Sequence, residues 1–230
     1  MGTTADMGEM EFIRSQVLPS LFEGLGTSIL LIVPSAVFGL VIGVAIGVFR
    51  VFGNPVSKRL ASAYVAIFRG FPLVVQLFIW YFGLPHLGIY FSPYTASIIG
   101  FSLCSGAYHS EYVRGALLSI KRGQLLAAQA LGFTRTGTIV SVILPQAIRR
   151  ALPGCGNEVI YLIKYSSLAY MITCIELTGK GKIIASETFK FTEIFMILGI
   201  FYLVMTTLAG RMLQYVESRL EIPGFEHFGA

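Results

Sequence analysis

The feature that most restricts how this chain can fold is an apolar run from Leu25 to Phe49 that contains no charged residue. An α-helix rises about 1.5 Å per residue, so this run is long enough to cross the roughly 30 Å hydrocarbon core of a bilayer. A second uncharged stretch runs from Ile194 to Gly210. A helix of this length in a soluble protein would carry a polar face, and neither stretch has one. The chain is therefore predicted to be an integral membrane protein.

The composition agrees with a membrane location. Of the 230 residues, 55% are hydrophobic and 13% are charged, and the mean hydropathy is +0.74. A soluble domain averages about 25% charged residues, so this chain has too few charges to cover a water-facing surface of ordinary polarity. Residues 1–24 include four acidic residues and no basic n-region, so no cleavable signal peptide is expected. The three cysteines are far apart, which predicts no metal site.

Five membrane-spanning helices are predicted, which makes the expected fold class all-α integral membrane. Their approximate bounds are Thr27–Phe49, Leu60–Leu84, Ala96–Ser119, Pro145–Leu168 and Ile194–Leu213. The second is interrupted at residues 69–72, where the sequence Arg-Gly-Phe-Pro favours a helix break. We expect an extracytoplasmic N-terminal segment (1–24), a transmembrane domain (25–217) and a cytoplasmic tail (218–230).

The distribution of basic residues predicts the orientation, because cytoplasmic loops accumulate Lys and Arg. Eleven basic residues lie around the first and third connections and in the C-terminal tail, against four in the N-terminal segment and the last connection. Those four are accompanied by seven acidic residues. We therefore place the N-terminus outside and the C-terminus in the cytoplasm, as an odd number of spans requires.

The first predicted span carries a repeat of small residues. Gly39, Gly43 and Gly47 are four residues apart, so they lie on one face and let another helix approach closely. That neighbouring helix could belong to this chain or to a second subunit, and the sequence is consistent with both.

The connection between the third and fourth spans has the pattern of a short helix. The residues of Gln124–Leu131 are Gln, Leu and Ala, which favour helix, and Gly132 has the permissive backbone that commonly ends one. Leu125, Ala128 and Leu131 recur at three-residue steps and form an apolar stripe. We expect a helix at the cytoplasmic membrane surface whose stripe either docks into a partner or rests on lipid.

Two alanines at 127–128, Gly132 and the Ile-Leu-Pro run at 143–145 resemble the EAA loop of ATP-binding-cassette (ABC) importer permeases. In that family the loop forms a coupling helix that docks into a cleft on a separate ATPase subunit. Leu126 stands where Glu is usual, so docking is expected to depend on shape and apolar burial more than on charge. The docking residues that the resemblance implies are Gly123, Gln124, Leu125, Leu126, Ala127, Ala128, Leu131, Gly132 and Pro145.

Three further segments resemble the polar amino acid branch of these permeases. Phe68–Leu77 is similar to its FRGTPLLVQL stretch, with Phe71 in place of the usual Thr. Tyr108–Gln124 resembles its AEIxRGGIxSVxxGQ segment. Asn157–Leu168 resembles its NEF…KDTSL segment, with Tyr165 in place of the usual Asp or Asn. The resemblance covers nearly the whole chain and implies a permease subunit that translocates a polar L-amino acid.

The resemblance also implies partners. The chain would pair with an identical or similar permease, and a dimer of ATPase subunits would bind ATP and Mg on the cytoplasmic side. An extracytoplasmic binding protein would deliver the substrate to this multi-pass protein of the prokaryotic cytoplasmic (inner) membrane. Apart from these proteins only lipid is expected as a partner, with no nucleic acid. The two Gly-Lys pairs at 179–182 are not followed by Ser or Thr, so the chain has no P-loop and is expected not to be an enzyme.

Several ionisable residues fall inside the predicted spans, where a charge costs on the order of 2.5–3.5 kcal/mol and therefore usually faces a cavity or a partner. A zwitterionic amino acid needs a cation for its carboxylate and oxygen atoms for its ammonium group. The candidates for a substrate pathway are Arg69, Gln76, Asn157, Glu158, Lys164, Ser166 and Ser167. Arg69 and Glu158 are also open to a structural role. Glu111 and Arg114 are expected to form a structural ion pair, and His109 to be a packed polar residue.

Other classes of function remain open on the residues alone. The chain could be the permease of an importer for a different small solute. A channel or an ATP-independent secondary transporter would also explain the intramembrane charges, but would usually need more spans or an internal repeat. A membrane enzyme would need a catalytic constellation, and the sequence has no His-Glu-x-x-His, Gly-x-Ser-x-Gly or paired cysteines.

Overall fold

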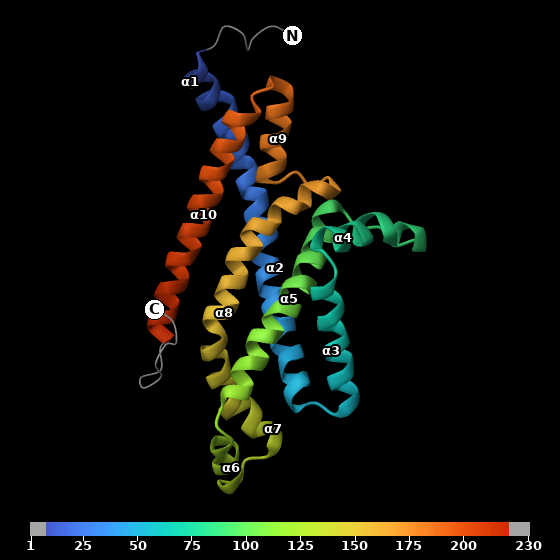
Figure 1. The fold of residues 1–230 in the computed structure, drawn as a ribbon, viewed down its shortest axis with the longest axis vertical. Helices are drawn as coiled ribbons and strands as arrows, with labels where there is room; N and C mark the ends of the chain where they lie inside the picture. The colour runs from blue at the N-terminus through green and yellow to red at the C-terminus, as the bar shows by residue number, and fades with distance from the viewer. Residues whose placement is uncertain (1–7, 221–230) are drawn as a thin grey trace.

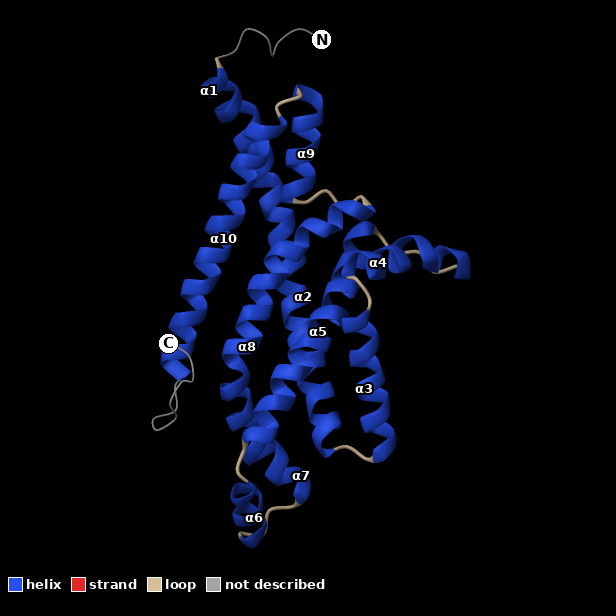
Figure 2. Cartoon of the chain, in the orientation of Figure 1, coloured by secondary structure: helices blue, strands red, loops and turns tan. Residues whose placement is uncertain are grey.

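The computed structural model describes residues 8–220, and within that range every regular element is a helix (Figure 2). The long helices are α2 (Leu18–Phe52), α3 (Pro55–Gly70), α5 (Pro93–Ser119), α8 (Leu144–Tyr165) and α10 (Phe191–Leu220). The shorter ones are α1 (Glu9–Phe12), α4 (Leu73–Phe78), α6 (Arg122–Ala130), α7 (Arg135–Thr138) and α9 (Leu177–Thr188). Five π- or 3-10-helical segments extend them: η1 (Ile13–Val17), η2 (Ile79–Gly83), η3 (Leu84–Leu87), η4 (Ile139–Ile143) and η5 (Ser166–Ile172). The predicted all-α class is confirmed for this range.

The first helix is much longer than predicted. Segments α1, η1 and α2 run on as one helix of 44 residues, Glu9–Phe52. At about 1.5 Å per residue it is roughly 66 Å long, twice the hydrocarbon core. Its first turns bury Phe12, Val17 and Leu21 against α9 and α10, and this packing keeps the helix going beyond the membrane-length run. Much of the expected N-terminal segment 1–24 is therefore helix, and residues 1–7 lie outside the described range.

The second predicted span is sharply bent at the expected break. Helix α3 ends at Gly70, and the helical stretch Leu73–Leu87 leaves at 102° to it (Figure 1). Pro72 has no N–H to continue the helix. The Gln76 amide Nε2 donates hydrogen bonds of 2.9 Å to the carbonyl oxygens of both Phe68 and Phe71, which satisfies backbone groups freed at the bend. The interruption at residues 69–72 was predicted, but the size of the bend was not.

Helix α5 lies at the centre of the bundle, packed along α2 (Figure 1). The three glycines of α2 face α5: a Cβ at Gly39 would meet Ser105, one at Gly43 would meet His109, and one at Gly47 would meet Val113. The small-residue repeat therefore serves packing within this chain.

The connection after α8, expected on the outer side, contains helix α9. It packs against α2 and α10 at the end of the molecule opposite α6 (Figure 1). Leu177 and Ala185 of α9 are fully buried with Ile194 and Leu198 of α10.

Two described helices, Glu9–Phe52 and Phe191–Leu220, are each long and apolar enough to cross a membrane. The number rises to as many as four if each of two bent pairs counts as one span, one at the α3–α4 bend and one where residues 135–172 meet α9 at 54°. The expected tail 218–230 begins inside α10, and the rest of it, 221–230, lies outside the described range.

Candidate functional site: a charged cluster, two cavities and a projecting helix

One carboxylate, that of Glu111 on α5, joins three helices. Its Oε1 lies 2.9 Å from Arg50 Nη1 of α2 and 3.1 Å from Arg69 Nη1 of α3, and its Oε2 lies 3.0 Å from Arg114 Nη2. The predicted Glu111–Arg114 pair is confirmed. The two other arginines are far away in the sequence, so their convergence was not anticipated. Three guanidinium groups share one carboxylate, which leaves an excess of positive charge here.

A cavity of about 450 Å³ lies at the bend between α3 and α4, within the size range of small-molecule sites. We call it the break cavity. It is lined by Arg69, Gly70, Phe71, Pro72, Leu73, Val74, Cys104, Tyr108, Tyr165 and Leu168. The Arg69 guanidinium lies 5.1 Å from the centre of the Tyr108 ring, as in a cation–π contact. The helix break thus places a cation beside aromatic rings from α5 and α8.

Glu158 of α8 is 3% exposed and lies close to this cavity. Its carboxylate is within hydrogen-bonding reach of Ser105 and within electrostatic range of Arg69. Two of the sequence-predicted pathway residues, Arg69 and Glu158, are thus brought into one region of the bundle. Together they offer a cation and an anion near the bend.

The other predicted pathway residues make local contacts. Ser166 and Ser167 each donate a hydrogen bond of 2.7 Å to a backbone oxygen three residues earlier, those of Ile163 and Lys164. The ammonium group of Lys164 lies 4.3 Å from the centre of the Tyr161 ring. Gln76 braces the α3–α4 bend, as described above. Asn157 is exposed and lies outside the lining of the break cavity.

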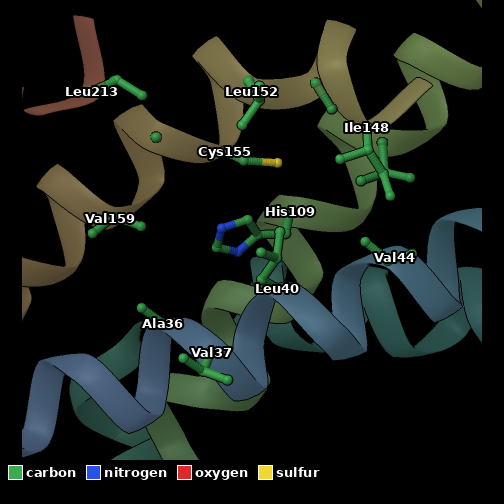
Figure 3. Close-up of a pocket in the computed structure, with 13 residues that line it drawn as sticks. Ala36, Val37, Leu40, Val44, His109, Ile148, Leu152, Cys155, Val159 and Leu213 are labelled. Atoms are coloured by element: carbon green, nitrogen blue, oxygen red, sulfur yellow. The ribbon is translucent and has the colours of Figure 1, made fainter. Parts of the chain in front are cut away.

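A second cavity, of about 260 Å³, lies among α2, α5, α8 and α10 (Figure 3). Aliphatic side chains such as Leu40, Ile148 and Val159 surround it, with the His109 ring at its centre. His109 is 1% exposed, and its Nδ1 lies 2.8 Å from the carbonyl oxygen of Ser105. The expectation of a packed polar residue is confirmed. An apolar cavity of this kind does not suit a zwitterion.

Helix α6 projects from the end of the molecule opposite α9 (Figure 1) and occupies the place predicted for a short helix. Gly132 ends it with φ of 87°, and the next N–H, of Phe133, donates to the Ala128 carbonyl oxygen at 3.1 Å. Such a backbone conformation favours glycine.

The prediction that the apolar stripe of α6 faces outward along its whole length is wrong. Leu125 packs on the buried cluster around Ile143, and Ala128 is 6% exposed, because the loop folds back onto η4. Of the predicted stripe only Leu131, 81% exposed, points away from the chain. The apolar side chains exposed at this end include Leu126 and Leu131, with Phe133 beside them.

Glu176 is a residue whose role sequence reasoning missed, because it was considered only as one of the acidic residues on the outer side. It is fully buried and begins α9. Its carboxylate accepts hydrogen bonds of 2.9 Å from the N–H groups of Thr178 and Gly179, 3.2 Å from the Tyr202 hydroxyl and 3.4 Å from the Ser28 hydroxyl. A carboxylate just before a helix start was the available signal.

Comparison with known proteins places this geometry in a family. The family of binding-protein-dependent transport system inner membrane components matches residues 39–222. The chain is 39% identical over 207 residues to the glutamine transport system permease protein GlnP of Escherichia coli K12, covering 89% of this chain and 94% of the relative. It is also 39% identical over 201 residues to the probable amino-acid ABC transporter permease protein YckA of Bacillus subtilis, covering 87% and 89%.

Two solved structures of ABC transporters also resemble this chain. A crystal structure of an amino acid ABC transporter with histidines matches with a TM-score of 0.83 and 31% identity, covering 93% of this chain and 99% of that one. An inward-facing structure of the MetNI methionine ABC transporter matches with a TM-score of 0.78 at 21% identity, covering 94% and 100%, a likeness of fold alone. With the family match over most of its length, this chain belongs to the binding-protein-dependent transport system inner membrane components, the permease subunits of ABC importers.

Proposed function

We propose that this chain is the inner-membrane permease subunit of an ATP-driven importer that takes up an amino acid. Its membership of the permease family and its 39% identity to GlnP support this proposal. A permease of this family is not an enzyme, so a separate subunit supplies ATP hydrolysis. An extracytoplasmic binding protein delivers the substrate.

The proposed topology has five spans, built on α2, the bent α3–α4 pair, α5, α8 and α10, with the N-terminus outside. Helix α5 is less apolar than a lipid-facing span because its polar residues, such as Ser105 and His109, are buried against its neighbours. The basic residues of the third connection gather around α6, at the end of the molecule opposite α9, which favours a cytoplasmic α6 (Figure 1).

Helix α6 is proposed as the coupling helix. The observation that carries this proposal is the exposure of Leu126 and Leu131, 54% and 81%, on a short projecting helix that Gly132 ends. Apolar side chains exposed at a polar membrane surface favour burial in a partner groove. The ATPase subunit provides that groove, and α6 would transmit its movement through η4 to α8.

The substrate pathway is proposed to pass the break cavity. Helix breaks within transporters commonly offer backbone groups and charged side chains to substrates. Here the Arg69 guanidinium would bind the α-carboxylate of the amino acid, and Glu158 would attract its ammonium group. A second permease, identical or similar, would complete the pathway, with two ATPase subunits beneath. Closure of the ATPase dimer would open the pathway outward, and release would open it to the cytoplasm.

The docking proposal is tested with the variant Leu131→Glu, which places a charge in the proposed interface. We expect the tagged variant to lose co-purification with the ATPase subunit while it still inserts into the membrane. Leu220→Glu, an equally drastic change at the end of α10, is the matched control and should keep the ATPase subunit bound. Equal retention of the ATPase subunit by both variants would overturn docking through α6.

A further inference from the structure

We propose that the break cavity selects an amino acid with an uncharged aromatic or branched aliphatic side chain. This inference rests on the proposed function, an amino acid importer, and departs from the polar cargo that the family resemblance implies. Three rings, those of Phe71, Tyr108 and Tyr165, come from three separate parts of the chain and line one cavity of about 450 Å³. Leu73 and Leu168 add aliphatic surface between them. Rings of this size offer a large apolar contact area to a side chain that enters.

The exposure of Arg69 indicates that the rings beside it face the substrate pathway and not the surrounding lipid. The Arg69 side chain, which lines the same cavity, is 42% exposed. A guanidinium group in contact with hydrocarbon is costly, so this exposed surface faces water or cargo. Phe71 is 52% exposed and Tyr165 is 38% exposed beside it. Two apolar rings are therefore presented where the cargo passes.

The charges around the cavity disfavour a cationic side chain. Among the described residues that line it, Arg69 carries the only full charge. Of the nearby carboxylates, Glu111 is shared by three arginines, and Glu158, 3% exposed, is the group proposed above to attract the α-ammonium group. The Tyr108 ring, which could stack on a cation, already lies 5.1 Å from Arg69. A lysine or arginine cargo would thus meet a like charge without a free counter-ion.

An acidic side chain is disfavoured for a different reason. Arg69 Nη1 already lies 3.1 Å from Glu111 Oε1, so its remaining N–H groups can hold one further carboxylate, and the α-carboxylate of any amino acid would take that place. A second carboxylate would then lie against rings and aliphatic carbon, where an unpaired charge is costly. The remaining wall of the cavity suits an uncharged apolar group.

Two of the positions at which the chain differs from the segments it resembles line this cavity. Phe71 stands where Thr is usual, and Tyr165 stands where Asp or Asn is usual. Both changes replace a small polar group by a ring, and both rings line the same cavity. The differences therefore act together on one binding surface.

Direct binding to the purified permease–ATPase complex tests this, because it bypasses the selectivity of the binding protein. Radiolabelled phenylalanine, leucine, glutamine, arginine and glutamate are the probes. We expect phenylalanine and leucine to bind more tightly than the other three, on the order of tenfold or more. Tightest binding of arginine, glutamate or glutamine would overturn the inference.

A matched pair of variants tests whether the residues that line the cavity determine the binding preference. Tyr165→Asp restores a carboxylate inside the cavity, so we expect it to lose phenylalanine binding and gain arginine binding. Tyr161→Asp makes the same change one helical turn away, outside the lining, and should leave the preference unchanged. An identical shift in both variants would contradict the assignment of Tyr165 as a specificity-determining residue.

The result also distinguishes this inference from the proposed function. If the complex binds no amino acid but the reconstituted importer still takes one up with ATP, the cavity proposal fails and the function stands. If the complete importer takes up no amino acid at all, the proposed function fails as well.

Discussion

Gly43 of α2 lies directly against His109 of α5, so closely that a Cβ at position 43 would overlap the His109 side chain and come within 3.1 Å of the Gly106 carbonyl oxygen. This contact allows the two helices to pack backbone to backbone at the centre of the bundle. The same packing brings Arg50, at the end of α2, to the carboxylate of Glu111 on α5.

Gly43→Ala should therefore destabilise the protein although alanine is the better helix former. We expect a loss of about 1–3 kcal/mol from overpacking, because the overlapping atom is the His109 Cβ, whose position is fixed by the backbone of α5. The measurement is the apparent Tm of the detergent-purified protein. Gly26→Ala, on the same helix with open space around it, is the control and should leave the Tm unchanged or raise it. A Tm for Gly43→Ala at or above the Gly26→Ala value would contradict the close packing.

Glu111→Gln should loosen the junction of α2, α3 and α5. The change leaves three arginines without their shared carboxylate, and the Arg50 side chain is only 14% exposed. We expect a loss of about 1–3 kcal/mol, seen as a lower apparent Tm. The control is Glu23→Gln, which removes the 2.8 Å ion pair between Glu23 and Lys180. Because the Glu23 carboxylate is 70% exposed, this change should cost under about 1 kcal/mol of stability. Equal losses in the two variants would argue against the three-helix junction.

Glu176→Ala should detach the start of α9 from the bundle. The side chain caps two N–H groups of α9 and accepts hydrogen bonds from Tyr202 and Ser28 on two other helices. Loss of a cap alone costs about 0.5–2 kcal/mol, and the buried partners add to this. Faster hydrogen exchange across residues 177–188 is the expected readout. The control is Glu187→Ala, which removes an exposed acid on the same helix and should leave that exchange unchanged. Exchange as slow as in the parent protein in both variants would refute the role of Glu176.

Gly132→Ala should weaken ATPase binding without affecting insertion. A side chain at φ of 87° is strained by about 1 kcal/mol, so the end of α6 frays. A penalty of that size corresponds to about fivefold weaker binding of the ATPase subunit. Gly199→Ala, on α10 with open space around it, is the control and should bind as the parent does. Unchanged affinity in Gly132→Ala would show that the shape of this helix end does not matter.

Local patterns in the sequence predicted those parts of the molecule that depend on neighbouring residues. The apolar runs predicted the long helices, Gly-Phe-Pro at 70–72 predicted the bend after α3, and Gly132 predicted the end of α6. The spacing of Glu111 and Arg114 predicted their ion pair. Each of these depends on contacts within about four residues, which a single sequence displays directly.

Contacts between distant segments could not be predicted in this way. Nothing near Glu111 in the sequence indicates that Arg50 and Arg69 share its carboxylate, because α2, α3 and α5 must first pack together. The buried state of Glu176 depends in the same way on Ser28 and Tyr202 from other helices. The inward packing of Leu125 was missed because the stripe pattern alone does not say which surface it covers.

The central claim, that this chain transports an amino acid by borrowing ATP hydrolysis from a partner, is tested most directly by uptake into proteoliposomes. The permease is reconstituted with its ATPase subunit and the binding protein, and the entry of radiolabelled amino acids is followed with and without ATP. The account predicts uptake that requires both ATP and the ATPase subunit. Uptake driven by an ion gradient in vesicles that contain the permease alone would contradict it.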